Sequence, residues 1–432
     1  PKQVIIPLSQ HIGAPAQAVV KKGDLVKVGT LLAKAGGFVS ANIHSSVSGK
    51  VNKIDNALDA SGYKRPAIYI DVEGDEWEET IDRSETLVKE CALSSKEIVD
   101  KIAASGIVGL GGATFPTQVK LMPPPGNKAE IVIINAVECE PYLTSDHSLM
   151  LEKGEQILVG VTILMKAVNV NKAVIGIENN KPDAIAHLSD LVRACGDARL
   201  SVCPLKTKYP QGGERMLIRA VTGRYLNSRL LPADRGCIVM NVASVLAAYG
   251  AISCGRPLTH CIMTVTGDAV SSPCNLEVPV GTSYAAVLAE AGGFSAEPEK
   301  VISGGPMMGT ALFSLDIPVT KTASSILALR HDPVALHDAS PCIHCGHCLH
   351  ACPEGLVPQL LSAAAEQEQF DVFEKYGGME CIECGSCAFV CPAGRHLVQS
   401  MRYGKRQTGA LIRARKAAET SNQTAQKGGA GK

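Results

Sequence analysis

The sequence predicts a multidomain α/β protein, and three observations support this fold class. The chain has 432 residues, of which 46% are hydrophobic and 19% charged, which is enough apolar material for several cores. Across residues 93–241, apolar β-type runs alternate with helix-length amphipathic stretches, the pattern of βα units around a parallel sheet. Shorter β-type runs with glycine-containing turns lie before and after that region. We therefore expect small β-rich modules on either side of a central α/β domain.

The first module spans residues 4–54, where short β-branched runs are separated by turn residues about every 8–12 positions. Residues 19–34, VVKKGDLVKVGTLLAK, followed by SSVSGKV, resemble the half-barrels of biotinyl and lipoyl carrier domains, which are all-β barrel-sandwich hybrids. Those carriers present a modified lysine at a hairpin between the two motifs. The corresponding stretch here, AGGFVSANIHS, contains no lysine, so we expect a structural relative of the carriers and not a carrier.

Two later segments complete the fold prediction. Residues 258–315 return to short β-type runs with a helix, YAAVLAEAGG, between them, which predicts a small β-grasp-like module. Residues 353–380 contain the stretch LVPQLLSAAAEQEQFDVFEKYG, which is typical of helices, so the region around it should be mainly α-helical. The last residues, from 406 onward, are rich in Ala, Lys, Gln and Gly, and we expect a basic flexible tail there.

Sixteen cysteines need an explanation, and half of them lie in two short arrays. The arrays, CIHCGHCLHACP and CIECGSCAFVCP, both match the C-x2-C-x2-C-x3-C-P run of bacterial two-cluster ferredoxins. In such runs the fourth cysteine ligates the cluster of the other run. We therefore assign one [4Fe–4S] cluster to Cys342, Cys345, Cys348 and Cys391, and the second to Cys381, Cys384, Cys387 and Cys352.

Zinc is the alternative occupant, because C-x2-C is also a zinc spacing and His344, His347 and His350 lie nearby. Two complete copies of a four-cysteine run that ends in proline favour iron–sulfur clusters. The other eight cysteines show no ligand spacing and are expected to be ordinary thiols, although Cys139 lies inside a motif described below. Regular arrays of metal ligands also indicate a reducing compartment.

A glycine-rich loop, GIVGLGGATFPTQVK, occupies residues 106–120. Glycine lets backbone N–H groups approach a phosphate or a flavin ring, and Lys120 could neutralise a phosphate. The loop is neither a Rossmann fingerprint nor a Walker A motif. Three further segments follow it along the chain: NAVECEPY from Asn135, YPQGGERMLI from Tyr209, and Asn241-Val242.

These four segments, in this order, resemble the flavin- and NADH-binding subunit of respiratory complex I, which has GRGGAGFPTGLKW, NADESEPG, YICGEETALI and NNVETL at the corresponding places. The resemblance implies an FMN pocket and a nicotinamide nucleotide site. Val137, Gly213 and Met240 depart from the family pattern. By matching position to position, the resemblance places Gly109, Gly111, Gly112, Lys120, Asn135, Glu138, Tyr209, Gly212 and Asn241 around FMN, and turns Phe115, Glu140 and Glu214 toward the nicotinamide nucleotide.

The order of the modules, over nearly the whole chain, resembles the family of C subunits of the Rnf complexes. That family implies a bacterial membrane-bound ferredoxin:NAD+ oxidoreductase that couples electron transfer to Na+ or H+ translocation. The C subunit is peripheral, handles NAD(H) and lies on the cytoplasmic side of the cell membrane. The modules implied are a barrel-sandwich hybrid over residues 1–60, an FMN- and NAD(H)-binding α/β domain over 61–257, a β-grasp module of the soluble-ligand-binding type over 258–330, a ferredoxin-like domain over 331–405 and a basic flexible tail over 406–432.

The same resemblance implies the cofactors and the partners. FMN, NAD(H) and two [4Fe–4S] clusters would carry the chemistry, and the protein would supply orientation and electrostatics, so no residue is assigned as a general acid or base. Other Rnf subunits would be direct partners, and reduced ferredoxin an indirect one. No apolar run of the sequence is long enough for a membrane span, so ion translocation would belong to other subunits.

Two alternatives stay open at this point. Cobalamin reductases of propanediol microcompartments also join a complex-I-like flavin domain to two clusters, but their barrel-sandwich segment follows the iron–sulfur region, whereas here it comes first. The second alternative is a non-enzymatic electron-transfer scaffold that has lost its flavin. This alternative stays open because Val137, Gly213 and Met240 depart from the family pattern.

The formal net charge is zero, since 42 Lys and Arg balance 42 Asp and Glu over the whole chain. The charges are nevertheless unevenly distributed along it. From residue 393 onward there are nine basic residues and one acidic residue, Glu419, so this end is basic and the rest of the chain is acidic. The basic end has neither interleaved aromatics nor a nucleic-acid motif, so a nucleic-acid partner is not expected. Docking to membrane partners or simple solvation would account for it.

Overall fold

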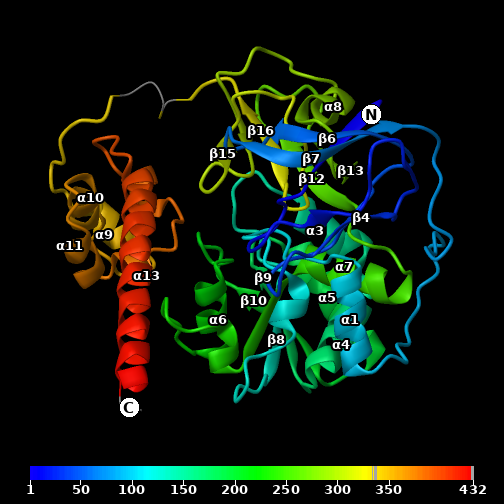
Figure 1. Ribbon diagram of the computed structural model, residues 1–432, viewed down its shortest axis with the longest axis horizontal. Coiled ribbons are helices and arrows are strands. Elements are labelled where there is room, and N and C mark those ends of the chain that lie inside the picture. The colour runs from blue at the N-terminus through cyan, green and yellow to red at the C-terminus, as the bar shows by residue number, and fades with distance from the viewer. Residues whose placement is uncertain (333, 335–337, 430–432) are drawn as a thin grey trace. The chain divides into compact units, whose positions relative to one another are not determined.

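The computed structural model describes residues 1–332, 334 and 338–429, and the chain divides into two compact units (Figure 1). The first unit comprises residues 1–226 and 230–331. The second comprises residues 227–229 and the part of the chain from residue 332 onward. Three modules make up the first unit, and helices around the cysteine arrays make up the second.

The N-terminal module packs two small sheets around one apolar core, as expected for a barrel-sandwich hybrid. Val4 and Ile6 alternate with more exposed neighbours along the first strand and are fully buried, which is the two-residue period of a half-buried strand. The first sheet extends past residue 60, where the sequence placed the end of the module, because residues 64–72 pair with two earlier strands. The sheets are β1 (Gln3–Pro7), β7 (Lys64–Val72), β6 (Gly49–Leu58) and β3 (Leu25–Val26), and β2 (Gln17–Ala18), β4 (Leu31–Lys34) and β5 (Ile43–His44).

The second module is a four-stranded parallel sheet with helices on both faces. Alternate residues of one strand enter different cores, since Val132 and Ile134 pack under α1, α4 and α7 whereas Ile131 and Ile133 pack under α6 (Figure 1). The strand order is β10 (Leu200–Leu205), β9 (Ala173–Glu178), β8 (Ile131–Asn135) and β11 (Cys237–Asn241). The helices are α1 (Ser95–Ala104), α2 (Thr117–Lys120), α3 (Ser145–Glu152), α4 (Gly154–Val168), α5 (Pro182–Cys195), α6 (Glu214–Thr222), the 3-10 helix η1 (Pro232–Arg235) and α7 (Val242–Ser253).

The third module is a five-stranded mixed sheet with one helix packed on it, which is the β-grasp-like arrangement that the sequence predicted. Ser283 starts the helix by accepting a hydrogen bond from the Ala286 amide. The elements are β12 (His260–Thr266), β13 (Cys274–Pro279), α8 (Tyr284–Glu290), β14 (Lys300–Ser303), β15 (Thr310–Ala311) and β16 (Ser325–Leu329), in the sheet order β13-β12-β16-β14-β15.

A buried lysine joins the three modules of the first unit. Lys321, only 1% exposed, donates hydrogen bonds of 2.7 Å to the carbonyls of Asn42 in the first module and Gly106 in the second. Its own amide donates to the side chain of Gln10 at 3.0 Å. Because an unpaired buried polar group is costly, these contacts fix the three modules to one another.

The second unit is helical and is built around Phe373, whose side chain is fully buried. Gly378 and Gly404 lie directly against its ring, since a Cβ atom on either would stand 2.3 or 2.6 Å from a ring carbon. The helix-rich insertion between the arrays is present as two helices. The elements are α9 (His347–Ala351), α10 (Pro358–Glu366), α11 (Phe370–Lys375), the 3-10 helix η2 (Gly378–Glu380), α12 (Ser386–Phe389) and α13 (Leu397–Gly429).

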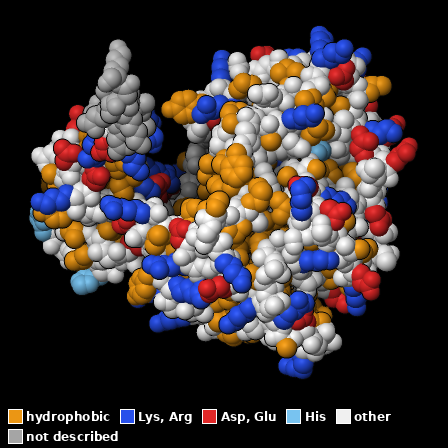
Figure 2. Space-filling model, turned by 60° about the horizontal axis from the view of Figure 1, so that its bottom comes forward, with side chains coloured by type: hydrophobic (Ala, Val, Ile, Leu, Met, Phe, Trp, Pro, Cys, Tyr) orange, Lys and Arg blue, Asp and Glu red, His pale blue; other side chains and the backbone are white. Residues whose placement is uncertain are grey.

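Helix α13 runs through the segment from residue 406 for which a flexible tail was expected. It is one helix of 33 residues, and its basic side chains form ion pairs, as between Arg415 and Glu374. Helix α13 packs on α10, α11 and α12. Among the side chains that the structure describes, Thr408 is the last buried one in this helix, and those after it are exposed or half-buried. No helix in the described ranges has the length and apolarity of a membrane span. Figure 2 shows acidic and basic side chains interspersed over the visible face of the first unit, without a field of one sign.

Candidate functional site

The first candidate site lies at the carboxyl ends of the parallel strands. From β8 the chain continues outward to β9 and β10, and then crosses back so that β11 pairs with the other side of β8. Strands are therefore added to one side of β8 first and to its other side afterwards, while all of them stay parallel. The place between β8 and β11 is thus a topological switch point, which is where open α/β sheets bind ligands. Asn135 and Asn241 end these two strands and lie opposite each other in the register. Both were predicted to line the FMN pocket.

The glycine-rich loop lies over this switch point. Its two arms are tied by the Gly109 amide, which donates to the Phe115 carbonyl at 2.8 Å, and the Leu110 amide donates to Ser244 at the start of α7. Gly111 has a φ of +70°, and a Cβ there would stand 2.9 Å from the side-chain nitrogen of Asn241. A side chain at this position would therefore be strained and would displace the asparagine.

The neighbouring Gly112 has no atom within 4 Å of the place where its Cβ would be. The loop consequently offers bare, exposed backbone toward open space beside Asn241. Glycine backbone with this access fits the flat ring or the phosphate of a flavin nucleotide. The residues present at the switch point therefore fit FMN.

The segments after β8 and β10 are tied together by polar contacts. The side-chain nitrogen of Asn135 donates to the Gly212 carbonyl at 2.8 Å, and the Gly212 amide donates to the thiol of Cys139 at 3.3 Å. Burial raises the pKa of Cys139 to about 11, so this thiol stays protonated at neutral pH. Tyr209 precedes a cis proline in the same segment and is half-buried. The structure thus brings together three of the predicted FMN residues, Asn135, Tyr209 and Gly212, in two segments that contact each other.

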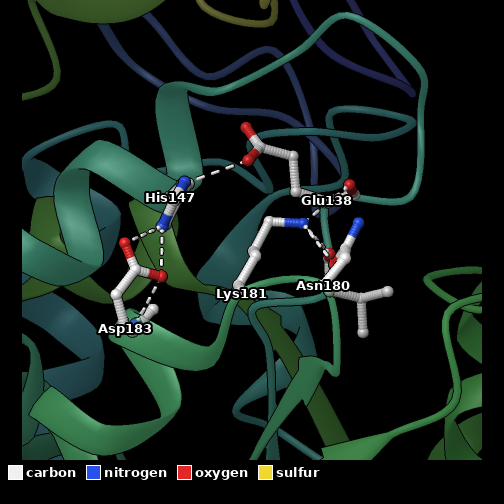
Figure 3. Close-up of polar contacts among 7 residues, drawn as sticks. Glu138, His147, Asn180, Lys181 and Asp183 are labelled. Carbon is white, nitrogen blue, oxygen red and sulfur yellow. Dashed lines mark hydrogen bonds and ion pairs between the residues drawn. The ribbon is translucent and has the colours of Figure 1, made fainter.

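Glu138 has a role in the structure that the sequence did not predict. Its carboxylate accepts hydrogen bonds from the amides of Asp146 and His147, at 2.7 and 3.1 Å, and so caps the first turn of α3. The backbone of Glu138 has a φ of +47°, a conformation that a residue other than glycine seldom adopts. Lys181, which is buried, donates to the carbonyls of Val137 and Glu138 and holds this turn (Figure 3).

Two half-buried carboxyl groups, those of Glu138 and Asp146, lie under the switch point. Burial, and then the neighbouring Glu138, raises the pKa of Asp146 to about 7, while a hydrogen bond from Asn241 at 2.8 Å acts in the opposite direction. Burial also raises the pKa of Glu138. His147 is oriented by Asp183, whose carboxylate lies 2.9 Å from its Nε2 (Figure 3). The pair Glu138 and Asp146 therefore holds a proton near neutral pH.

The residues predicted for phosphate and nicotinamide contacts are distributed differently. Lys120 forms an ion pair of 3.3 Å with Glu214 and also donates to the Val239 carbonyl. The carboxylate of Glu140 accepts hydrogen bonds from the amides of Met307 and Met308, in the third module, at 2.7 and 3.0 Å. Lys120 and Glu214 are thus close to each other, as expected for one site, whereas Glu140 contacts a loop that the sequence did not connect with it.

The second candidate site consists of two cavities in the second unit. The larger has a volume of about 380 Å³, and four thiols line it, those of Cys342, Cys345, Cys348 and Cys391. The smaller is lined by the thiols of Cys352, Cys381, Cys384 and Cys387. Each set takes three cysteines from one array and the last cysteine from the other array. These are the two sets that the spacing predicted.

The two arrays have the same local geometry. His344 and Glu383, each immediately before the second cysteine of its array, have φ values of +53° and +58°. In both arrays the amide of this residue donates to the sulfur of the first cysteine, over 3.4 Å, in the manner of amides that bond cluster ligands. The charges differ, because Glu383 forms ion pairs with Lys405 and Arg402 of α13.

In the smaller cavity, each thiol makes it harder for its neighbours to ionise. Burial, and then the neighbouring thiols of Cys381, Cys384 and Cys352, raises the pKa of Cys387 to about 12. Such a group of thiols becomes a set of thiolates when metal ions supply positive charge. The donor set of four cysteines around each cavity therefore fits a [4Fe–4S] cluster.

Comparison with known proteins identifies the family. The chain is 48% identical over 407 residues to the C subunit of the proton-translocating ferredoxin:NAD(+) oxidoreductase complex of Clostridium ljungdahlii, a match that covers 94% of this chain and 88% of that protein. It is 47% identical to the C subunit of the Na(+)-translocating complex of Acetobacterium woodii, covering 94% and 91% of the two chains. The chain belongs to the RnfC family.

Family models match every module of this RnfC chain. They describe an RnfC barrel sandwich hybrid domain at residues 1–75, a Nuo51 FMN-binding domain at 102–250, an SLBB domain at 262–311 and a 4Fe-4S dicluster domain at 341–395. The FMN-binding match covers the switch point and its glycine-rich loop, and the dicluster match covers both cavities. RnfC proteins are the C subunits of the Rnf complexes, so the resemblance drawn from the motifs is confirmed.

Solved structures agree with the fold of this RnfC chain. An NAD+-reducing [NiFe]-hydrogenase in the H2-reduced state matches with a TM-score of 0.51 and 18% identity, over 73% of this chain and 63% of that one. At this level of identity the likeness concerns the fold alone.

Sequence reasoning missed several residues around the first site of this RnfC chain. Lys181 follows β9 as Asn135 ends β8, so a charged residue just past a buried strand was the available indication. Asp146 lies in a polar stretch that gives no sign of its contact with Asn241. The Met307 and Met308 amides could not have been found, because backbone donors leave no pattern in the sequence beyond the glycines that shape their loop.

Proposed function

We propose that this chain is the subunit of an ion-translocating ferredoxin:NAD+ oxidoreductase that passes electrons between reduced ferredoxin and NAD(H). The observation that carries the proposal is the presence, in one RnfC chain, of a glycine-lined switch point and two crosswise four-cysteine cavities. A flavin exchanges electrons in pairs with a nicotinamide and singly with iron–sulfur clusters, and the clusters carry one electron at a time. These two sites together supply what such a transfer requires.

The residues of the first site would bind and orient FMN. Gly109, Gly111 and Gly112 offer their backbone to it, Asn135, Glu138, Tyr209, Gly212 and Asn241 enclose the switch point, and Lys120 supplies a positive charge for the phosphate. The nicotinamide nucleotide would contact Phe115, Glu140 and Glu214. Val137, Gly213 and Met240 depart from the complex I pattern, and at Val137 the backbone amide and carbonyl take part in the polar contacts of this region instead.

The two half-buried carboxyl groups of Glu138 and Asp146 would give this site a place to hold a proton. Asp146 is linked to Asn241, a residue proposed to contact FMN, through a hydrogen bond of 2.8 Å. Its pKa, raised to about 7, would let it hold a proton up to near neutral pH beside the position proposed for FMN. The chain thereby buffers charge at the switch point without a general acid or base.

The choice of coupling ion and the location of the chain are further parts of the proposal. Relatives of nearly equal identity are named proton-translocating and Na(+)-translocating, which supports assigning the choice of ion to other subunits. The chain would be a peripheral subunit of the cell membrane complex on its cytoplasmic side, in contact with other Rnf subunits. Ferredoxin would act through those subunits.

Anaerobic purification of the chain tests the proposal. We expect a flavin absorbance, about eight irons per chain for two cubane clusters, and bleaching of the cluster absorbance on addition of NADH. Cys345→Ser should lower the iron content, whereas Cys195→Ser, an exposed cysteine outside both cavities, should not. Bound zinc in place of iron, or absence of flavin after extraction, would contradict the proposal.

A further inference from the structure

The hairpin loop of residues 304–309 in the third module holds the side chain of Glu140. One carboxylate oxygen of Glu140 accepts both the Met307 amide, at 2.7 Å, and the Met308 amide, at 3.0 Å. The backbone of Gly305 lies so close that a Cβ there would stand 1.9 Å from the Cγ of Glu140. This loop therefore fits around a carboxylate that comes from the second module.

Two successive amides that point at one oxygen form a small anion-binding nest. The geometry does not depend on a side chain, because the donors are backbone groups and the close approach requires glycine at position 305. A phosphate oxygen has the same charge and acceptor character as the carboxylate oxygen that now fills the nest. The nest can consequently bind a phosphate when the carboxylate leaves.

The base of the loop is fixed, whereas its tip has no strand pairing. Ile302 pairs with Ala311 and Ser303 with Thr310, and the hydroxyl of Tyr284 lies 2.6 Å from that of Ser303. The loop itself, the sequence GGPMMG, is closed by the Gly309 amide donating to the Gly305 carbonyl at 2.9 Å. This turn keeps the nest preformed on a rigid hairpin.

Glu140 comes from the segment that leaves β8 at the switch point. The same segment contains Asn135 and Cys139, which contact the Gly212 loop. The nest thus lies next to residues of the proposed nucleotide site, although it belongs to a different module. A dinucleotide bound at the switch point could reach it with its pyrophosphate.

We propose that the loop of residues 304–309 is a binding element for the pyrophosphate of NAD(H), which Glu140 occupies in the absence of nucleotide. Nucleotide binding would exchange the carboxylate for a phosphate oxygen in the nest and free Glu140 to accept hydrogen bonds from ribose hydroxyls. The inference rests on the proposed function, since it assigns Glu140 to the nicotinamide nucleotide.

The test uses inorganic pyrophosphate as the probe against the whole, cluster-loaded protein. Pyrophosphate should inhibit NADH-dependent reduction of an artificial electron acceptor competitively with NADH. Glu140→Gln and Glu140→Ala remove the competing charge, so the inhibition constant of pyrophosphate should fall at least about threefold. The KM for NADH should rise in the same two variants, because the ribose contact is lost.

Opposite changes for the two ligands distinguish this role from a structural one. If Glu140 merely stabilised the loop, both variants would weaken the binding of pyrophosphate and of NADH alike, or the inhibition constant of pyrophosphate would not change. Either result would overturn the proposal. Glu290→Gln, an exposed carboxylate of α8 in the same module, is the matched control and should change neither constant. Flavin content and bleaching by NADH in the unaltered protein report on the proposed function separately, so failure of one is distinguishable from failure of the other.

Discussion

The side-chain nitrogen of Asn241, at the end of β11, donates a hydrogen bond of 2.8 Å to the half-buried carboxylate of Asp146 in the first turn of α3. The oxygen of the same side chain caps α7 by accepting from the amides of Ala243 and Ser244. One asparagine therefore links two helix starts to the switch point. The carboxylate it contacts is also repelled by Glu138, and its pKa is raised to about 7.

Asp146→Asn should change how stability depends on pH. The folded protein binds a proton at Asp146 between the ordinary pKa of 3.8 and the raised value of about 7, where the unfolded chain has lost it. The contribution of Asp146 to the free energy of unfolding is therefore largest at low pH and is lost as pH rises toward 7. Relative to the variant, the unaltered protein should lose up to about 1.4 kcal/mol per pH unit across this window. Urea unfolding at several pH values measures this difference.

The control for that measurement is Asp190→Asn, which removes an exposed carboxylate that pairs with Arg193 on α5. The difference in the free energy of unfolding between Asp190→Asn and the unaltered protein should stay nearly constant with pH. Equal slopes for Asp146→Asn and the unaltered protein would show that Asp146 is ionised in the fold.

Double cysteine substitutions test the crosswise ligand sets. Cys352→Ser with Cys387→Ser removes two ligands of one cavity, so one cluster and about four irons should remain. Cys348→Ser with Cys352→Ser removes one ligand from each cavity, so both clusters should be impaired. Iron analysis and electron paramagnetic resonance of the reduced protein give the count. If each array instead supplied all four ligands of its own cluster, the two double variants would exchange their results.

Lys321→Met should reveal the buried amino group at the junction of the three modules. Burial lowers the pKa of Lys321 to about 7 from its ordinary 10.5, so between these values the unfolded chain binds a proton that the folded chain has released. The stability of the unaltered protein should therefore rise with pH across this window, relative to the variant. His11 and His44 face the same group, and the pKa of each is lowered, first by burial and also by Lys321.

The absolute stability of this variant is less informative, because the carbonyls of Asn42 and Gly106 lose their donor in it. The pH slope from chemical unfolding between pH 7 and about 10 is the relevant readout. Lys22→Met, at an exposed lysine of the first module, is the control and should leave the slope unchanged. If Lys321→Met also leaves the pH slope of the unfolding free energy unchanged, Lys321 is not a neutral buried lysine.

Two glycines of α13 should respond oppositely to alanine. A Cβ on Gly404 would lie 2.6 Å from the ring of Phe373, so Gly404→Ala should destabilise the second unit by about 1–3 kcal/mol through overpacking. At Gly409 the nearest atom would be 3.5 Å away, so Gly409→Ala should stabilise the helix by about 0.5–1 kcal/mol. Thermal unfolding of both variants, followed by circular dichroism, compares them directly. Equal effects would mean that the Phe373 core tolerates rearrangement.

The order of the modules and the cysteine sets could be predicted because both depend on local patterns. Strand alternation, amphipathic periods and a fixed ligand spacing need only neighbouring residues. Contacts between distant segments could not be predicted in this way. Glu138 and Glu140 matched a family motif, yet one caps α3 and the other enters a backbone nest 167 residues further along the chain. The basic tail was expected to be flexible because of its composition, and composition alone did not indicate that α13 begins at Leu397 and packs on α10, α11 and α12.

With these ligand sets, the order of synthesis decides when the clusters can form. The first array leaves the ribosome with only three of the four thiols that its cavity requires, and the missing one, Cys391, belongs to the second array. The second cavity is complete only when Cys387 has been synthesised, and its fourth thiol, Cys352, comes from the first array. If the thiols that line each cavity are the ligands of one cluster, neither half of the duplicated motif would acquire a complete cluster alone. Maturation would then follow translation of both halves, and a chain truncated between the arrays would leave both cavities incomplete.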